Sequence, residues 1–355
     1  MKNPFKFGTI VEDEFFTDRV EELKLVRRVL DGENHLILIS PRRFGKSSLI
    51  MKAVHEIGRP YLWLNMQRIV DVQDFAAKLL KEALRIYPWE KLKHLMSHFR
   101  IVPLVSMNPL TNGMDVSFQP SMSSDVLLED VMGLLERVST ERRKLIVVFD
   151  EFQEVHSIGK GLDKQLRSLM QEQKNLNYII MGSQESMMTE IFERKKSPFY
   201  HFGRLMHLQR IPYDDFYKYI KERMAPHSAD VNVVVSDILS VTQCHPYYTQ
   251  QLASQVWELM TYEQQTDNVV ETAINQLTRE HDLDFERLWV SFNQTDKRIL
   301  LELVEGKNPM QVRQRASSTQ YSALKRMMQM GYVIRNEQYE VEDPFFKYWI
   351  RKNVL

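Results

Sequence analysis

Residues 36–50 read LILISPRRFGKSSLI and come close to G-x-x-x-x-G-K-[ST], the pattern of a phosphate-binding loop. Gly45, Lys46 and Ser47 fill the last three positions, and Ser40 stands where the first glycine belongs. In such a loop, backbone amides and a helix N-terminus bind phosphate oxygens, the lysine neutralises the outer phosphates and the hydroxyl ligates Mg²⁺. We therefore predict a nucleotide-binding loop of Ser40, Pro41, Arg42, Arg43, Phe44, Gly45, Lys46, Ser47 and Ser48.

The residues on either side of this loop have the periodicity that the motif requires. Leu36 to Ile39 form a continuous apolar run, which is typical of a strand buried on both faces of a parallel sheet. After Lys46, apolar residues recur at helical spacing as far as Gly58, a candidate C-terminal cap. This order favours a phosphate loop over a chance Lys-Ser pair. Glycine at the first position mainly provides conformational freedom, so we expect Ser40 to end the strand with a negative φ.

A second apolar run ends in two carboxylates. The segment RRKLIVVFDE (residues 142–151) leads through five apolar residues to Asp150 and Glu151, which is the form of a Walker B segment. In that segment the aspartate orients Mg²⁺, and the following glutamate polarises the attacking water. An acidic pair that caps the next helix is the alternative, and the apolar run makes it the weaker one. We predict Ser47 and Asp150 as Mg²⁺ ligands and Glu151 as the residue that orients water.

A third apolar run also ends in polar side chains. The segment LNYIIMGSQES (residues 176–186) places Ser183 and Gln184 at the end of a strand. Either side chain is a candidate sensor of the γ-phosphate or of the lytic water. A polar strand end without a catalytic role remains the alternative.

These segments resemble the archaeal-type predicted ATPase family, P-loop ATPases of the AAA+/STAND branch that also occur in bacteria. FFTDRVEELKLVRRVL (residues 15–30) resembles the family's F-x-x-R-x-x-E-L box, and SPRRFGKSSL its G-P-R-R-x-G-K-[ST]-S-L loop. VVFDEFQEV resembles its Walker B segment, and IIMGSQESMM its Gly-Ser strand end. The resemblance runs over most of the chain and implies ATP or ADP and Mg²⁺ as ligands.

Two later segments extend the resemblance. SPFYHFGRLMHLQRIPYDDF (residues 197–216) carries the family's Gly-Arg pair, which implies that Arg204 contacts the γ-phosphate of its own or a neighbouring subunit. A surface arginine that orders the loop is the alternative. TQCHPYYTQQLASQVWEL (residues 242–259) resembles the lid motif G-[HN]-P-Y-Y-x-Q, with Cys244 in place of the glycine. This implies that His245 and Pro246 close over the adenine, with a structural histidine as the alternative.

The pattern along the chain predicts an α/β protein in three parts. Residues 1–208 read as a P-loop NTPase αβα sandwich with a parallel sheet, and residues 101–120 read as a hairpin insertion turning at Asn112-Gly113. Residues 209–288 read as a helical lid. Residues 293–355 read as a winged helix-turn-helix, with a short helix at 310–317, a third helix ending at Gly331 and a wing turning at Asn336-Glu337.

The predicted winged helix gives mixed signals about its partner. Residues 293–355 contain 11 basic and 7 acidic residues, a net charge of +4 against zero for the whole chain. A DNA-reading third helix presents side chains to the major groove, and this one offers only Lys325 and Arg326 among apolar residues. We favour packing on the nucleotide domain, a protein partner or self-association over DNA, which stays open.

Composition narrows the class of protein. No apolar run approaches the roughly 20 residues that span a bilayer, and the first 16 residues lack the apolar region of a signal peptide. The single Cys244 excludes a disulfide framework within the chain, so we expect a cytoplasmic protein without membrane partners.

The leading hypothesis is an ATPase that hydrolyses ATP slowly with Mg²⁺ to switch the lid and the winged helix between two arrangements. The alternative is a regulatory module that holds ATP or ADP, binds DNA or protein and hydrolyses little. Ser40 and the uncertain role of Arg204 motivate the alternative.

Overall fold

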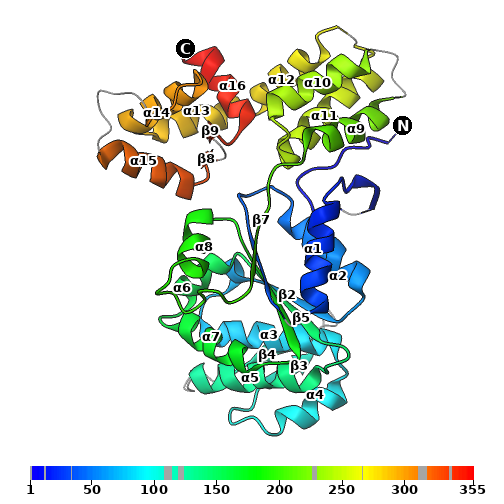
Figure 1. The fold of residues 1–355 in the computed structure, drawn as a ribbon, viewed down its shortest axis with the longest axis vertical. Coiled ribbons are helices and arrows are strands. Elements are labelled where there is room, and N and C mark those ends of the chain that lie inside the picture. The colour runs from blue at the N-terminus through cyan, green and yellow to red at the C-terminus, as the bar shows by residue number, and fades with distance from the viewer. Residues whose placement is uncertain are drawn as a thin grey trace. The chain divides into compact units, whose positions relative to one another are not determined.

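The computed structural model describes residues 2–11, 13–32, 34–107, 114–118, 124–225, 230–265, 267–310, 318–335 and 338–355. The chain divides into two compact units, which are coloured by residue number in Figure 1. The sheet unit comprises Val20–Ser40 and Leu49–Leu208. The C-terminal unit comprises Met1–Arg19, Pro41–Ser48 and Gln209–Leu355, so the segment that carries the phosphate-loop motif is grouped with the C-terminal residues.

A parallel five-stranded sheet forms the centre of the sheet unit, in the order β2-β5-β6-β1-β7. Its strands are β1 (Leu36–Ile39), β2 (Tyr61–Asn65), β5 (Leu145–Asp150), β6 (Leu176–Gly182) and β7 (Arg204–His207). Every residue of β1, β5 and β6 is buried, as the three apolar runs predict for strands covered on both faces. The prediction of a parallel sheet within an α/β P-loop fold is confirmed.

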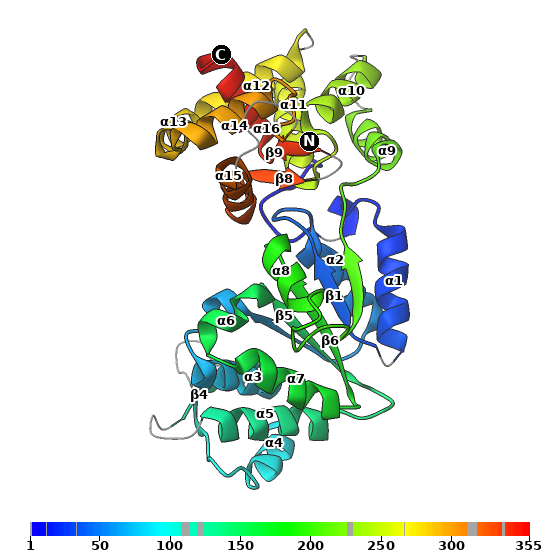
Figure 2. The same ribbon diagram turned by 60° about the vertical axis from the view of Figure 1, so that its left-hand side comes forward.

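Helices cover both faces of this sheet (Figures 1 and 2). Alternate strand residues such as Ile37, Phe149 and Ile180 share one apolar core with the helices that follow β2 and β5. The helices are α1 (Val20–Asp31), α2 (Lys46–Ile57), α3 (Val72–Ile86), α4 (Trp89–Met96), α5 (Ser124–Val138), α6 (Val155–Ile158), α7 (Leu162–Glu172) and α8 (Glu185–Phe192). Three short 3-10 helices are η1 (Asp13–Phe15), η2 (Met66–Arg68) and η3 (Phe152–Glu154).

The expected hairpin insertion is an antiparallel pair outside the main sheet. Strand β3 (Leu104–Met107) pairs with β4 (Met114–Ser117), and β4 lies against α3. Lys81 of α3 lies 2.6 Å from an Asp115 carboxylate oxygen. The predicted turn at Asn112-Gly113 lies outside the described residues.

Five helices account for most of the described residues between 213 and 291, which fits the expectation of a helical lid. The helices are α9 (Tyr213–Met224), α10 (Val231–Thr242), α11 (Pro246–Tyr262), α12 (Val269–Glu280) and α13 (Asp282–Ser291). The N-terminal segment packs on them: Phe5 makes an edge contact with Tyr219, and the Asn3 amide donates to the Ser254 carbonyl oxygen. Among the described residues, no helix is both long enough and apolar enough to cross a membrane.

The last part of the chain shares an apolar core with these helices. It consists of α14 (Gln294–Val304), α15 (Ser318–Gln329), β8 (Val333–Arg335), β9 (Tyr339–Val341) and α16 (Pro344–Asn353). Strands β8 and β9 pair antiparallel. The expected helix at 310–317 lies largely outside the described residues, and so does the wing turn at Asn336-Glu337. The winged helix-turn-helix therefore stays a prediction, as do the three domain boundaries.

A close approach of two backbones fixes the start of β7. A Cβ atom placed on Gly203 would lie 2.6 Å from the carbonyl oxygen of His35, the residue before β1. The amide of Arg204 donates to this same oxygen over 2.7 Å. Glycine at position 203 therefore permits the edge strand to pair with β1.

We expect Gly203→Ala to lower the free energy of unfolding by about 1–3 kcal/mol, because backbone must move to admit the methyl group. Gly133, inside α5, is the matched control: nothing lies within 4 Å of its added Cβ. Gly133→Ala should leave stability unchanged or raise it by up to about 1 kcal/mol. Urea unfolding of both variants makes the comparison, and equal stability of Gly203→Ala and wild type would contradict it.

Candidate nucleotide site

Three neighbouring strands of the sheet end in the polar residues that the motifs single out. Asp150 is the last residue of β5, Ser183 follows β6, and Ser40 follows β1. Strand β6 lies between the other two, and the Ser40 amide donates to the Gly182 carbonyl oxygen over 3.4 Å. Because parallel strands end at one edge of a sheet, these residues lie together there, where open α/β sheets bind ligands.

The Glu151 carboxylate is oriented by the end of the neighbouring strand. Its Oε2 accepts hydrogen bonds from the Ser183 hydroxyl over 2.6 Å, the Ser183 amide over 3.3 Å and the Gln153 side-chain amide over 2.5 Å. Glu151 itself has a left-handed backbone (φ 54°), and its amide donates to Asp150 Oδ1. The Ser183 side chain, predicted as a sensor, therefore contacts the Glu151 carboxylate and helps to orient it. Gln184 is the N-cap residue of α8.

The structure holds the phosphate-loop motif in a curved conformation between β1 and α2. Arg43 and Gly45 have positive φ angles of 64° and 88°, whereas Ser40 is not among the positive-φ residues. Ser40 is fully buried, as a residue that ends a covered strand should be. Lys46 is the first residue of α2, and its ammonium donates to the Pro41 carbonyl oxygen over 2.8 Å. Ser47 and Ser48 follow in the first turn of α2.

Residues distant in sequence brace this loop within the C-terminal unit. The buried Arg19 donates through Nη2 to the Phe44 carbonyl oxygen over 3.3 Å and to the Gln209 carbonyl oxygen over 2.7 Å. The Val11 amide donates to the Ser48 hydroxyl over 3.0 Å. Arg19 was not selected as a site residue from the sequence. It is the arginine of the F-x-x-R-x-x-E-L box, so that motif was the signal that could have identified it.

The Arg43 side chain is engaged by aromatic residues of α11. Its Nη1 donates to the Tyr248 hydroxyl over 2.9 Å, and its guanidinium carbon lies 4.6 Å from the Tyr247 ring centroid. The Tyr248 hydroxyl in turn donates to Glu342 Oε2 over 2.8 Å. Neither Tyr248 nor Glu342 was selected from the sequence: Tyr248 is the second tyrosine of the lid motif, which was the available signal, whereas no motif pointed to Glu342. Arg42 is exposed.

His245 is buried at the start of α11 next to the loop. Its Nδ1 accepts from the Tyr247 and Tyr248 amides, so the proton resides on Nε2, which lies 3.4 Å from Glu342 Oε1. Its ring makes an edge contact with Phe44, at 4.8 Å between centroids. Burial lowers the pKa of His245, so the ring is neutral at pH 7. These N-cap contacts support the alternative interpretation, in which His245 has a structural role. Pro246 is the first residue of α11.

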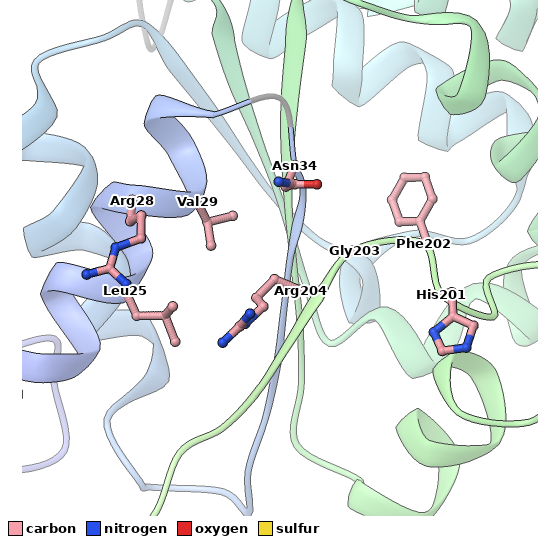
Figure 3. A pocket seen from close by; sticks show the side chains of 8 residues that line it. All are labelled: Leu25, Arg28, Val29, Asn34, His201, Phe202, Gly203 and Arg204. Atoms are coloured by element: carbon pink, nitrogen blue, oxygen red, sulfur yellow. The ribbon is translucent and has the colours of Figure 1, made fainter.

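Arg204 lies at the opposite edge of the sheet from the strand ends described above. It pairs with Leu36, the first residue of β1, while His207 pairs with Ile39, the last. Three residues of a parallel strand span about 10 Å. Figure 3 shows the Arg204 side chain beside Leu25 and Arg28 of α1, in a cavity of about 410 Å³. This position gives no support to a contact from Arg204 to a γ-phosphate of its own subunit, and the role of Arg204 stays a prediction.

The residues suited to Mg²⁺ are few but fit its chemistry. Among the described residues no group of three or more histidine, cysteine, aspartate or glutamate side chains is placed to hold a metal. Mg²⁺ in nucleotide sites takes only one or two carboxylates beside phosphate oxygens and water. Asp150, a largely buried carboxylate at a strand end, and the Ser47 hydroxyl each carry an oxygen donor of the kind that such sites use.

The two basic residues of α15 that a DNA-binding role would use have different surroundings. Arg326 lies 2.5 Å from an oxygen of the buried Asp296 carboxylate, in α14. Lys325 is exposed. Arg326 thus joins two helices of the fold, which leaves Lys325 as the exposed member of the pair.

Comparisons with known proteins agree with this geometry. The profile of a family described as an ATPase domain predominantly from Archaea matches residues 16–252. None of the curated proteins compared with the chain matches it.

Several solved structures are similar over nearly the whole chain. The Walker-type ATPase of Pyrococcus abyssi is 18% identical, with a TM-score of 0.67 over 95% of this chain and 97% of that one. The Aeropyrum pernix ORC2 protein, solved with ADPNP and ADP, is 14% identical, with a TM-score of 0.55 over 98% and 96%. The Aeropyrum pernix ORC1 protein in complex with DNA is 13% identical, with a TM-score of 0.50 over 95% and 93%. At these identities the likeness establishes the fold.

The geometry of the loop predicts what a glycine at its first position would do. Because Ser40 ends a strand without a positive φ, Ser40→Gly should change ATP affinity by less than about twofold. It should lower the free energy of unfolding by about 0.5–1 kcal/mol, the entropic effect of an added glycine. Calorimetric titration with ATP and urea unfolding measure the two quantities.

Gly45→Ala is the contrasting variant, because it places a side chain at φ 88°. The left-handed conformation disfavours it by about 1–2 kcal/mol, so both stability and ATP affinity should fall. A tenfold gain in ATP affinity for Ser40→Gly would mean instead that the loop is a degraded site.

Proposed function

Because the chain belongs to the family of ATPase domains found predominantly in Archaea, we propose that it binds ATP at residues 40–48 and hydrolyses it with Mg²⁺. The observation that carries the proposal is the alignment of Asp150, Glu151 and Ser183 at one edge of the sheet, beside the strand from which the loop departs. The amides from Arg43 to Ser48 and the N-terminus of α2 bind phosphate oxygens, and Lys46 neutralises the outer phosphates.

Glu151 orients the attacking water for in-line displacement at the γ-phosphate. The Ser183 hydroxyl and the Gln153 amide point the Glu151 carboxylate by donating to a single oxygen, Oε2. The other oxygen, Oε1, is then the one offered to water. Ser47 and Asp150 would hold Mg²⁺, which would neutralise charge on the phosphates. We do not include Arg204 in this set within one subunit, given its place at the start of β7.

The hydrolysis serves a conformational switch of the C-terminal unit. Support comes from the loop residues Arg43 and Phe44, which contact Tyr248 and His245 at the start of α11. Occupancy of the loop is thereby linked to the helical part of the chain. We expect slow turnover, since a switch functions by holding the triphosphate. DNA binding receives less support from the residues, because Arg326 is paired with Asp296.

Replacing the loop lysine tests nucleotide binding. Lys46→Ala should lower ATP affinity at least tenfold, because a charge-assisted contact to phosphate contributes about 1.5–3 kcal/mol. Lys52→Ala, in the same helix and beside Glu56, is the control and should bind ATP as wild type does. Unchanged ATP affinity in Lys46→Ala would refute the nucleotide site.

Replacing the water-orienting carboxylate tests hydrolysis separately. Glu151→Gln should bind ATP normally and lose at least about 99% of phosphate release, because general-base assistance contributes 10²–10⁴-fold. Glu154→Gln is the matched control: its carboxylate accepts from the Ser157 hydroxyl, and turnover should persist. Full phosphate release by Glu151→Gln would place the water-orienting group elsewhere, with Gln153 or Glu154 the next candidates, whereas no release by wild type would favour a scaffold that holds nucleotide.

A further inference from the structure

Arg43 adopts a backbone conformation that its side chain disfavours. Its φ of 64° lies in the left-handed region, where a Cβ atom crowds the following carbonyl group. Gly45, with φ 88°, adopts the same region without such crowding. A non-glycine residue stays in this region only where its surroundings fix it. The surroundings of Arg43 therefore help to decide the shape of the loop.

Two tyrosines of α11 provide those surroundings. The Tyr248 hydroxyl accepts a hydrogen bond from Arg43 Nη1 over 2.9 Å, and the guanidinium lies over the Tyr247 ring. Much of the Arg43 side chain is exposed, whereas Tyr248 is 1% exposed. The buried Tyr248 therefore has a fixed position, and its hydrogen bond restrains the more exposed Arg43 side chain.

Glu342 orients the Tyr248 hydroxyl. A hydroxyl has one proton, and Tyr248 donates it to Glu342 Oε2, which leaves the oxygen lone pairs for Arg43. Burial and the neighbouring carboxylates Asp343 and Glu342 raise the pKa of Tyr248, so the hydroxyl remains a donor. The second Glu342 oxygen faces His245 Nε2, and the His245 ring packs on Phe44. The Glu342 carboxylate is thus connected to two adjacent loop residues, to Arg43 through Tyr248 and to Phe44 through His245.

The backbone of Glu342 is itself fixed by the C-terminal residues. Its amide donates to the Tyr332 carbonyl oxygen over 3.0 Å, beside the β8–β9 pair. The next residue, Asp343, is the N-cap of α16 and accepts from the Phe345 and Phe346 amides. The Glu342 backbone, from which the carboxylate projects, therefore moves only if the end of β9 or the start of α16 moves.

From these contacts we infer that Tyr248 and Glu342 are positioning residues for ATP binding, which act through Arg43 to hold the phosphate loop in its binding conformation. This role rests on the proposed function. It makes the turn between β9 and α16 part of the machinery that sets nucleotide affinity, although it touches no phosphate. By thermodynamic linkage, a partner that displaced this turn would change ATP affinity, and ATP would change the affinity for that partner by the same factor.

The test is a double-mutant cycle on ATP affinity in the full-length chain. Tyr248→Phe removes the hydroxyl and keeps the ring, and Glu342→Gln removes the charge and keeps the size. Each should weaken ATP binding by roughly three- to tenfold, the scale of one charge-assisted hydrogen bond at a partly exposed site. Calorimetric titration with ATP and Mg²⁺ gives the affinities.

Arg43→Gly provides the diagnostic background. Glycine adopts the left-handed conformation by itself, so the loop no longer needs the anchor. In this background Tyr248→Phe and Glu342→Gln should each change ATP affinity by less than about twofold. Such non-additivity identifies residues that act through a common partner, and a merely structural role of Tyr248 would not produce it.

Two control variants remove similar groups elsewhere in the C-terminal unit. Tyr217→Phe deletes a hydroxyl that donates to Asn232, and Glu340→Gln weakens the pair with Arg210. Both should bind ATP as wild type does. Thermal unfolding without nucleotide shows whether each variant is folded.

The positioning role is overturned if Tyr248→Phe lowers thermal stability but leaves ATP affinity unchanged. It is also overturned if the loss on Tyr248→Phe is as large in the Arg43→Gly background as in wild type. Either result, found together with weak binding by Lys46→Ala, leaves the proposed ATP site intact. Failure of wild type to bind ATP overturns both.

Discussion

The pairing of β6 with β5 on one side and β1 on the other is the constraint on which the candidate site depends. All three strands are buried along their whole length, so polar side chains, apart from Asn177 and Tyr178 near the start of β6, appear only where each strand ends. Parallel pairing then brings those ends to a common edge. Asp150, Glu151, Ser183 and Ser40 meet there although up to 143 positions separate them in sequence. Because the interior of the sheet is apolar, the polar side chains of the candidate site lie at the carboxyl ends of its strands.

At that edge, the Glu151 carboxylate is oriented by hydrogen bonds from neighbouring polar groups. Glu151 has a left-handed backbone and one carboxylate oxygen occupied by Ser183 and Gln153. Because buried or partly buried polar groups must be hydrogen-bonded, the contacts that satisfy Glu151 also aim it. A site prepared in this way needs little rearrangement to act on water.

The loop obeys the same requirement over a longer range. Carbonyl oxygens and side chains of residues 41–48 find partners in Arg19, Val11, Tyr248 and His245, all from other parts of the C-terminal unit. A loop that contains left-handed residues other than glycine needs such partners. These contacts explain why the loop is grouped with the C-terminal residues. They also connect the loop to α11, so a change in the loop can affect this helix.

The sequence by itself determined the buried strands and predicted the chemistry at their ends. The apolar runs predicted strands buried on both faces, since only continuous hydrophobicity fits that environment. The Gly-Lys-Ser and Asp-Glu segments predict phosphate and water chemistry, because short motifs depend on local geometry alone. The expected negative φ of Ser40 also followed from its place at a strand end.

Tertiary structure decided which residues serve the site from a distance. Arg204 follows a motif-like glycine, but the register Leu36 with Arg204 places it at the amino edge of the sheet. Tyr248 belongs to the lid motif, which does not indicate this contact, and Glu342 belongs to no motif, yet packing brings Tyr248 to Arg43 and Glu342 to Tyr248. Strand register and side-chain packing arise from contacts between residues far apart in the chain, and a local pattern contains no information about them.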